Sequence, residues 1–232
     1  MKIILKGLLK MKILYEDKYL LICEKPVGVE SQVSSKNKCD MPTLLSEYRK
    51  EKGEDAYIGV VHRLDTATGG AMIYSKRSDM TGKLSALVQS GDYKKVYLAV
   101  VHGEPAEQSS EMRDLLYHDK MRNKSFVCDK KRSGVKEAIL NYRVLDTVVA
   151  EDGEKKSLVE IELVTGRTHQ IRVQFASRKM PLVGDGKYGS RDNKAICALW
   201  SHKVEFVHPV TKKTVEVEST PKSVYPWDLF EI

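Results

Sequence analysis

The sequence predicts an α+β fold with a mixed, mostly antiparallel central sheet flanked by helices and loops. Strand-like segments outnumber helical ones, and they do not alternate regularly with helices as they do in doubly wound parallel sheets. The 232 residues, of which 41% are hydrophobic, can bury a sizeable core. No linker rich in Pro, Gly or Ser divides the chain. We therefore expect one domain over residues 13–232, preceded by a short extension over residues 1–12.

The first half of the chain combines short apolar runs with two helical patterns. Thr43 and Ser78 are each expected to cap a helix whose apolar side chains recur at helical spacing. The turn residues Lys25-Pro26-Val27-Gly28 end the first apolar run. The predicted elements are strands at 20–23, 57–61, 71–75 and 96–101, and helices that end near Gly53 and at Gly91.

The second half of the chain is mostly extended. Residues 138–149 and 158–164 are predicted strands, and the turn at 151–154 joins them into a hairpin. In the second of these strands apolar residues alternate with glutamates, which is typical of a half-buried strand. Thr168 is expected to cap a helix through about Arg178. Three late strands are predicted at 195–200, 203–207 and 214–218.

The cysteine pattern and the lack of a long apolar run indicate the compartment in which the protein is expected to act. The four cysteines form no Cys-x-x-Cys pair and complete no zinc site with histidine. We interpret them as free thiols of a reducing compartment, and expect a cytoplasmic protein without a metal. No apolar run approaches the roughly 18 residues that span a membrane. The N-terminus lacks the features of a secretory signal, and a second Met-Lys-Ile at Met11 leaves the natural start open.

Positive charge gathers between Lys120 and Lys136. The whole chain carries a formal net charge of +7, and this segment holds seven basic residues and one acid, with Phe126 among them. Such a segment can follow phosphates and stack an aromatic ring on a base, or it can be a solvated surface hairpin. We favour RNA contact, with Lys130, Lys131 and Arg132 as the central candidates.

Four motifs carry the chemistry. The stretch from Val60 to Gly70 places Asp65 two residues after Arg63, between an apolar run and a pair of glycines, where a carboxylate can be aimed at a substrate. The other three are Lys25-Pro26-Val27-Gly28, Lys95-Val96-Tyr97 and Gly166-Arg167-Thr168-His169-Gln170-Ile171-Arg172. In this order the motifs resemble the RluA family of RNA pseudouridine synthases, from about Ile13 to the C-terminus.

The resemblance implies a cofactor-free isomerase that converts uridine to pseudouridine. The reaction breaks the bond between N1 of uracil and C1′ of ribose and rejoins the base through C5. Asp65 is the implied nucleophile, because aspartate is ionised near neutral pH. Arg172 is expected to pair with Asp65, and Tyr97 is the third catalytic candidate. Arg63 is expected to fill the gap that the flipped uridine leaves in the RNA.

Residue chemistry alone leaves several of these roles open. Arg167 could equally be the charge partner of the nucleophile or a phosphate contact. Tyr97 could be a core tyrosine, stack on the base or take part in proton transfer. His62 could bind RNA or be a structural residue. Whether Asp65 attacks the base or the ribose is also open.

The chain departs from the family pattern at one motif. Thr68-Gly69-Gly70 stands where the family usually has Thr-Ser-Gly, so a hydroxyl group is replaced by glycine. Residues 181–189 match the family's Gly-Asp-x-x-Tyr-Gly segment. They do not form a phosphate-binding Walker A loop, because Pro181 stands where its first glycine is needed and Tyr188 follows Lys187. The S4-type N-terminal domain of some family members is not expected here.

We therefore predict a pseudouridine synthase catalytic domain that acts as a monomer on structured RNA, either ribosomal or transfer RNA. No membrane association and no obligate protein partner are expected. A non-catalytic RNA-binding protein with the same fold is the alternative, although binding alone would not need Asp65, Tyr97 and Arg172 together. A hydrolase with an aspartate nucleophile would also need a base to activate water, and the sequence offers no convincing candidate.

Overall fold

The computed structural model describes residues 12–33 and 39–232, which form two compact units. The first unit comprises the described part of Met1–Tyr93 together with Ser201–Ser219. The second comprises Lys94–Trp200 and Thr220–Ile232. The predicted extension over residues 1–12 lies outside the described residues, Lys12 apart, as does the choice between Met1 and Met11.

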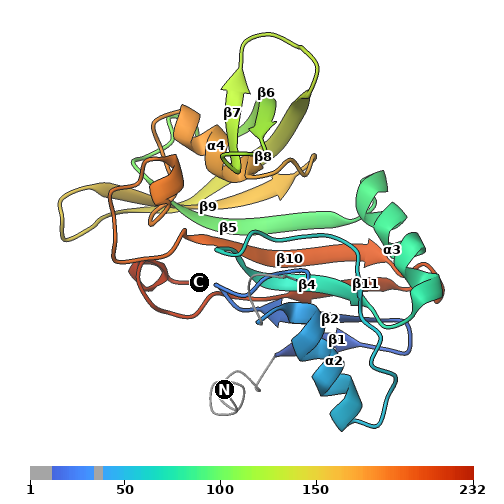
Figure 1. The fold of residues 1–232 in the computed structure, drawn as a ribbon. Helices are drawn as coiled ribbons and strands as arrows, with labels where there is room; N and C mark the ends of the chain where they lie inside the picture. Colours follow the sequence, from blue (N-terminus) through green and yellow to red (C-terminus); the bar gives the residue numbers. More distant parts are fainter. Residues whose placement is uncertain (1–11, 34–38) are drawn as a thin grey trace. The chain divides into compact units, whose positions relative to one another are not determined.

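The first unit is built on a sheet whose central strand is β4 (Figure 1). All seven residues of β4 are buried, which suits a strand with neighbours on both edges. Strand β2 pairs with β4 in antiparallel register, with Ile22 opposite Ile73, and β1 pairs with the other edge of β2. The strands of this unit are β1 (Ile13–Glu16), β2 (Leu20–Lys25), β3 (Gly59–Val60), β4 (Gly69–Ser75), most of β10 (Leu199–Val207) and β11 (Thr214–Glu218).

Two helices accompany this sheet, and their N-terminal caps differ from those predicted. Helix α2 (Met41–Glu51) begins after Asp40, whose side chain accepts a hydrogen bond of 2.9 Å from the Thr43 amide, so Asp40 and not Thr43 is the cap. Helix α3 (Ser78–Ser90) begins after Arg77, which makes no side-chain capping bond. It ends, as predicted, at Gly91, which has the left-handed conformation common after helices.

The core of the first unit joins the face of the sheet to helix α3. Alternate residues of β2 and β4, such as Leu20 and Ile73, lie against Met80 and Leu84 of the helix and Phe206 of β10. The helical spacing of the apolar residues in α3 and the period of two in the strands explain this arrangement.

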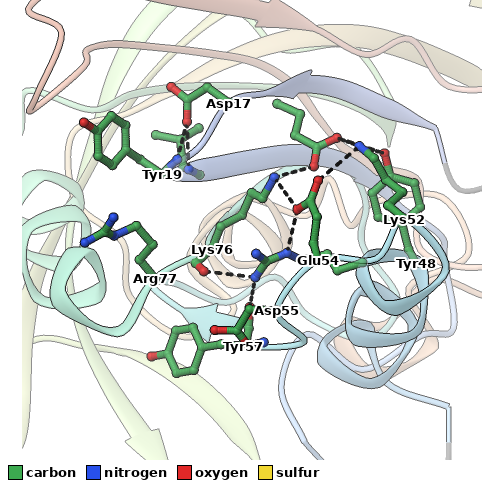
Figure 2. A network of polar contacts seen from close by, with 12 residues as sticks. Asp17, Tyr19, Tyr48, Lys52, Glu54, Asp55, Tyr57, Lys76 and Arg77 are labelled. Carbon is green, nitrogen blue, oxygen red and sulfur yellow. Dashed lines mark hydrogen bonds and ion pairs between the residues drawn. The ribbon is translucent and has the colours of Figure 1, made fainter.

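A network of buried and half-buried charges connects α2 to the edge of the sheet (Figure 2). The Lys76 ammonium lies 2.7 Å from Glu16 and 2.8 Å from Glu54, and Arg49 of α2 lies 3.2 Å from Glu54. Burial alone would raise the pKa of Glu16, but hydrogen bonds from Lys76, Lys52 and Tyr48 outweigh it and lower the pKa to about 2. These carboxylates are therefore ionised throughout the neutral range and hold the C-terminal end of α2 in place.

The second unit is a sheet of long antiparallel strands in the order β5-β9-β8-β6-β7 (Figure 1). The predicted hairpin turn is confirmed, because the Ala150 amide donates to the Glu154 carbonyl over 3.0 Å between β8 and β9. The elements are β5 (Lys94–His102), β6 (Ser109–Asp119), β7 (Lys124–Cys128), β8 (Val135–Val149), β9 (Lys155–Leu163), α4 (Gln170–Ser177) and the 3-10 turns η1 (Gly186–Tyr188) and η2 (Trp227–Leu229).

The predicted α+β class with a mostly antiparallel sheet is confirmed, while single elements differ. Strand β6 was not expected, because its polar residues alternate poorly with apolar ones. The strands predicted at 195–200 and 203–207 form the single strand β10, which begins at Leu199. In the described ranges, no helix is long and apolar enough to cross a membrane.

Candidate catalytic site

The loop that carries Asp65 lies between β3 and β4 of the first unit. Before Asp65, the Ser31 hydroxyl donates to the carbonyl of buried Leu64 over 2.6 Å and accepts from its amide over 3.1 Å. After Asp65, the Thr68 amide donates to the Asp65 carbonyl over 2.9 Å and closes a turn. Asp65 itself is half-buried. The backbone is therefore fixed on both sides of the predicted nucleophile.

A buried lysine adds to this support. The Lys25 ammonium donates to the carbonyl oxygens of Pro26 at 2.9 Å, Val29 at 2.7 Å and Thr66 at 3.4 Å, and the residue is 0% exposed. The Gly28 amide donates a second hydrogen bond to the Thr66 carbonyl, at 2.8 Å. One ammonium group thus joins the Lys-Pro-Val-Gly turn to the residue that follows Asp65.

The Lys25 ammonium also interacts electrostatically with the Asp65 carboxylate. Burial lowers the pKa of Lys25 to about 8, while the carboxylates of Glu30 and Asp65 raise it. A pKa near 8 leaves the ammonium mostly protonated at neutral pH. We infer that Lys25 supplies positive charge beside Asp65. In the sequence this motif serves as a turn and as part of the family resemblance, and no role was predicted for its lysine.

The second glycine of Thr68-Gly69-Gly70, which aligns with the glycine of the family's Thr-Ser-Gly, has a steric reason, whereas nothing in the structure explains the glycine at position 69. Gly70 has a φ of +108°, which L side chains rarely adopt. A Cβ at this position would also collide with the backbone of Ser201. The Ser201 hydroxyl donates to the Ala71 carbonyl over 2.8 Å, so this close approach is part of the packing of the first unit.

His62 and Arg63 precede Asp65 and lie in different surroundings. The His62 Nε2 atom accepts from the Ile73 amide over 3.3 Å, and its ring lies 5.6 Å from that of Tyr93. These contacts support the structural role of His62, and its binding of RNA stays a prediction. Arg63 is exposed two residues before Asp65, and its base-flipping role also stays a prediction.

Tyr97 lies on β5 of the second unit, opposite Ile161 of β9, and is 6% exposed. Lys95 lies two residues earlier and therefore on the same face of the strand. Burial lowers the pKa of Lys95, and its ammonium lies next to Gly166, where an added Cβ would be 3.7 Å away. Strand β5 thus brings two of the sequence motifs of the second unit together.

Arg172 lies in the first turn of α4 and makes a two-pronged ion pair with Asp185. Its Nε atom lies 2.7 Å from Oδ2 and its Nη2 atom 2.8 Å from Oδ1 of that carboxylate. Both side chains are buried, with residue exposures of 6% for Arg172 and 1% for Asp185. Two parallel charge-assisted bonds fix the plane of the guanidinium group. The expected pairing of Arg172 with Asp65 stays a prediction.

Arg167 is held by the backbone around α4. Its Nε atom donates to the Glu137 carbonyl over 2.8 Å, and its amide donates to the Gln170 side chain over 3.0 Å. The helix begins after His169, which has a left-handed φ of 55°, so the predicted cap at Thr168 is displaced by one residue. Arg167 remains exposed, and its role as a phosphate contact stays a prediction.

The basic segment from Lys120 to Lys136 consists of a turn, strand β7, the connection to β8 and the first two residues of β8. Lys130, Lys131 and Arg132 are exposed in that connection, and the Arg132 guanidinium lies 5.5 Å from the centre of the Tyr117 ring. The Lys124 ammonium lies 5.9 Å from the ring of half-buried Phe126. The hairpin therefore presents cations next to aromatic rings, an arrangement suited to a nucleic-acid backbone and its bases.

The described residues contain no group of three or more His, Cys, Asp and Glu side chains that could hold a metal ion. Their candidate groups are instead a carboxylate on a fixed loop, buried cations and a strand tyrosine. Such groups suit nucleophilic and electrostatic catalysis.

A family comparison identifies the class of protein to which the chain belongs. The model of the RNA pseudouridylate synthase family matches residues 19–177. This chain belongs to that family. The match contains the Asp65 loop, Tyr97 and Arg172, and it confirms the resemblance drawn from the four motifs.

Curated relatives place the chain near the RluA-type enzymes. It is 31% identical over 215 residues to the uncharacterized RNA pseudouridine synthase YhcT of Bacillus subtilis (strain 168), covering 90% of this chain and 68% of the relative. It is 32% identical over 213 residues to ribosomal large subunit pseudouridine synthase C of Buchnera aphidicola subsp. Baizongia pistaciae (strain Bp), covering 88% and 64%. The chain thus spans about two thirds of the length of these relatives.

Solved structures show the same fold. Human RNA pseudouridylate synthase domain containing 1 superposes with a TM-score of 0.77 at 20% identity, over 95% of this chain and 87% of that one. The human domain-containing 4 protein gives a TM-score of 0.74 at 20% identity, over 95% and 92%. At this identity the likeness concerns the fold alone.

Proposed function

We propose that this protein converts uridine to pseudouridine in structured RNA, with Asp65 as the nucleophile. The observation that carries the proposal is the loop around Asp65 in a chain of this family. Ser31 and Thr68 fix its backbone on either side, and buried Lys25 supplies a positive charge beside the carboxylate. A catalytic group needs such preorganisation, whereas a surface aspartate that ends a turn does not.

The proposed reaction needs no co-substrate. Asp65 takes part in breaking the bond between N1 and C1′, by attack on either the ribose or the base. The detached uracil turns within the site, C5 bonds to C1′, and the bond formed by Asp65 breaks to release the carboxylate. The C5 proton leaves while N1 gains one. All atoms of uridine except the exchanged protons are retained, so the net change is an isomerisation.

The remaining residues receive roles that match their chemistry. Arg172 keeps the Asp65 carboxylate charged and oriented, and Tyr97 stacks on the target base and assists in the transfer of the C5 proton. Arg63 occupies the gap in the RNA stack. His62, Arg167, Lys130, Lys131 and Arg132 bind the surrounding RNA. The protein acts as a cytoplasmic monomer in this proposal.

The names of the relatives suggest the order in which substrates should be tested. Several are named ribosomal large subunit pseudouridine synthases, including those of Buchnera aphidicola and Pseudomonas aeruginosa. Large-subunit ribosomal RNA is therefore the first candidate, and transfer RNA is the second.

Two measurements test the proposal. Pseudouridines are mapped in RNA from cells with and without the gene, and at least one site should be lost without it. The purified protein should then release tritium from a transcript of that site labelled at C5 of uridine. Binding of the transcript without any release would instead support the alternative, a non-catalytic RNA-binding protein.

A further inference from the structure

The segment Gly184–Gly189 has no role in the reaction proposed above, yet it touches Arg172 at two points. Asp185 binds the edge of the guanidinium group through two bonds, as described for the site. The Arg172 Cζ atom also lies over the ring of Tyr188, 5.1 Å from the ring centre. A carboxylate at the edge of the group and an aromatic ring next to it restrict both its plane and its position.

Tyr188 is itself held in place by its hydroxyl group. The Ser125 amide donates to the Tyr188 Oη atom over 2.8 Å, and the His169 Nδ1 atom lies 2.9 Å from the same oxygen. Since Oη accepts from Ser125, its own hydrogen can be donated to His169. Ser125 is bonded in turn to the Thr168 carbonyl over 2.6 Å, just before α4. The ring is thus tied to the start of the helix that carries Arg172.

Asp185 lies on an equally constrained backbone. Its carbonyl accepts from the amides of Tyr188 at 3.0 Å and Ser190 at 3.1 Å. Gly184 has a φ of +76°, and a Cβ there would lie 2.5 Å from the Ala195 carbonyl oxygen. Backbone packing therefore sets the position of the carboxylate, and Arg172 must fit to it.

Stability alone does not account for this arrangement. A buried ion pair gains little net stability, because removing both charges from water costs about as much as their attraction returns. A hydrophobic pair of similar volume would serve the core as well. What the ion pair and the ring provide is a fixed direction for the charge of Arg172.

We propose that Asp185 and Tyr188 are positioning residues for Arg172, which hold its guanidinium group in the orientation needed to meet the catalytic carboxylate. The proposal rests on the function proposed for this chain. Asp185 binds the Nε and Nη2 side of the group, so in this scheme the catalytic carboxylate is met by the side that carries Nη1. Neither residue touches the RNA in this scheme, and each acts through Arg172.

The main test is the single-turnover rate of Asp185→Asn on an RNA that the wild type modifies. The amide can accept one of the two bonds but turns an N–H group toward the second guanidinium nitrogen. The rate should fall about 100-fold, the cost of a displaced catalytic group. The RNA dissociation constant should change by less than about twofold, because the pair does not contact RNA.

Measuring Asp185→Asn in a second protein, Arg172→Lys, separates a positioning role of Asp185 from a general loss of structure. Lysine at position 172 is a point charge without a plane to align, so Asp185→Asn should cost less than about threefold in Arg172→Lys protein. Equal losses in both backgrounds would overturn the proposal. Asp114→Asn is the matched control, because Asp114 pairs with Arg178 at 2.9 Å near the other end of α4. Its rate should stay within about twofold of the wild type.

Two further measurements keep the proposal testable if the Asp185→Asn protein does not fold or if the wild type shows no activity. Tyr188→Leu keeps the carboxylate pair and removes the ring, and should slow the wild type about tenfold but leave Arg172→Lys protein unchanged. In NMR spectra the Arg172 Nε–H signal should exchange slowly with solvent, and Tyr188→Leu should speed this exchange. If the wild type were inactive but its Arg172 Nε–H signal exchanged slowly, the fixed position of Arg172 would be supported and the proposed function would be refuted. A rapidly exchanging signal in the wild type would refute the positioning itself.

Discussion

The surroundings of Asp65 in the first unit and of Arg172 in the second fix a charged residue in two different ways. The loop of Asp65 is held largely through main-chain atoms, with Lys25 and Ser31 bonded to its carbonyls and amides. Arg172 is held through its side chain, by the carboxylate of Asp185 and the ring of Tyr188. A nucleophile must form and break a bond, whereas an electrostatic partner acts through a constant orientation. The difference in support matches the difference in their proposed roles.

Among the variants that test this comparison, removal of the lysine bonded to the Asp65 loop should have the largest effect on stability and turnover. Lys25→Met leaves the carbonyls of Pro26, Val29 and Thr66 without their donor. We expect the free energy of unfolding to fall by about 3 kcal/mol. The turnover rate of the folded fraction should fall about 100-fold, because the loop shifts. Urea unfolding and single-turnover kinetics measure the two effects.

Lys83→Met is the control for that variant, because Lys83 is an exposed lysine on α3 of the same unit. It should leave both quantities nearly unchanged. If Lys25→Met behaved like this control, the lysine would not support the loop, and the contrast between the two regions would be lost.

RNA binding should depend on the basic hairpin of the second unit. Replacing Lys130, Lys131 and Arg132 by alanine removes three exposed cations, so fewer counterions are released on binding. The affinity should fall roughly 30- to 100-fold at physiological salt, and the slope of log affinity against log salt should decrease by about 2 to 3. Filter binding over a range of salt concentrations gives both values.

A charge-matched triple variant provides the comparison for the hairpin. Lys83, Lys212 and Lys213 are exposed lysines of the first unit, and replacing them by alanine changes the net charge equally. Similar slopes for the two triple variants would mean that the hairpin is only a solvated surface.

Arg63→Ala should slow structured substrates more than unstructured ones. An arginine that fills the vacated stack offsets about 1–3 kcal/mol of the cost of flipping, so its loss should lower kcat/KM about tenfold on a stem-loop. A short single strand of the same local sequence should be much less affected. Equal losses on both RNAs would point to a direct contact with Asp65 or with a phosphate.

The network at the end of α2 should give the smallest effect and no change in catalysis. Glu16→Gln should lower the free energy of unfolding by about 1 kcal/mol at pH 7, since water partly screens the ion pairs of Glu16 with Lys76 and Lys52. The pKa of Glu16 is lowered from 4.5 to about 2, so its contribution is complete above pH 4.5 and is lost as the pH falls toward 2. Urea unfolding of both proteins at pH 7 and pH 3 should show the difference shrinking. A constant difference would assign it to packing instead of charge.

Much of the fold could be predicted from local patterns. The turn between β8 and β9 and the end of α3 at Gly91 follow from turn and cap residues alone. The missed strand β6 is stabilised by pairing with β8 over nine residue pairs, which compensates for its weak apolar pattern. The cap at Asp40 was missed because Thr43 is also a good capping residue, and only the backbone conformation decides between them.

The candidate site could be predicted less completely. Short motifs identify Asp65, Tyr97 and Arg172 as candidates through the family resemblance, whereas residue chemistry alone does not choose between Arg172 and Arg167. Asp185 is 13 residues from Arg172, and no spacing rule joins an arginine in a helix to a carboxylate in a later loop. The Gly-Asp-x-x-Tyr-Gly segment of the sequence contains both Asp185 and Tyr188. It was identified as a family motif, but no partner was predicted for its carboxylate. The role of Lys25 depends on complete burial, which a lysine in a turn motif does not suggest.

The most direct test of this account is the rate of pseudouridine formation by Asp65→Asn under single-turnover conditions, with RNA binding measured on the same preparation. Asparagine keeps the shape of the side chain but is neither charged nor a competent nucleophile. We expect tritium release from C5-labelled uridine to be abolished, while the melting temperature and RNA affinity stay close to those of the wild type. Near-normal turnover by this variant would contradict the account and remove Asp65 from the mechanism.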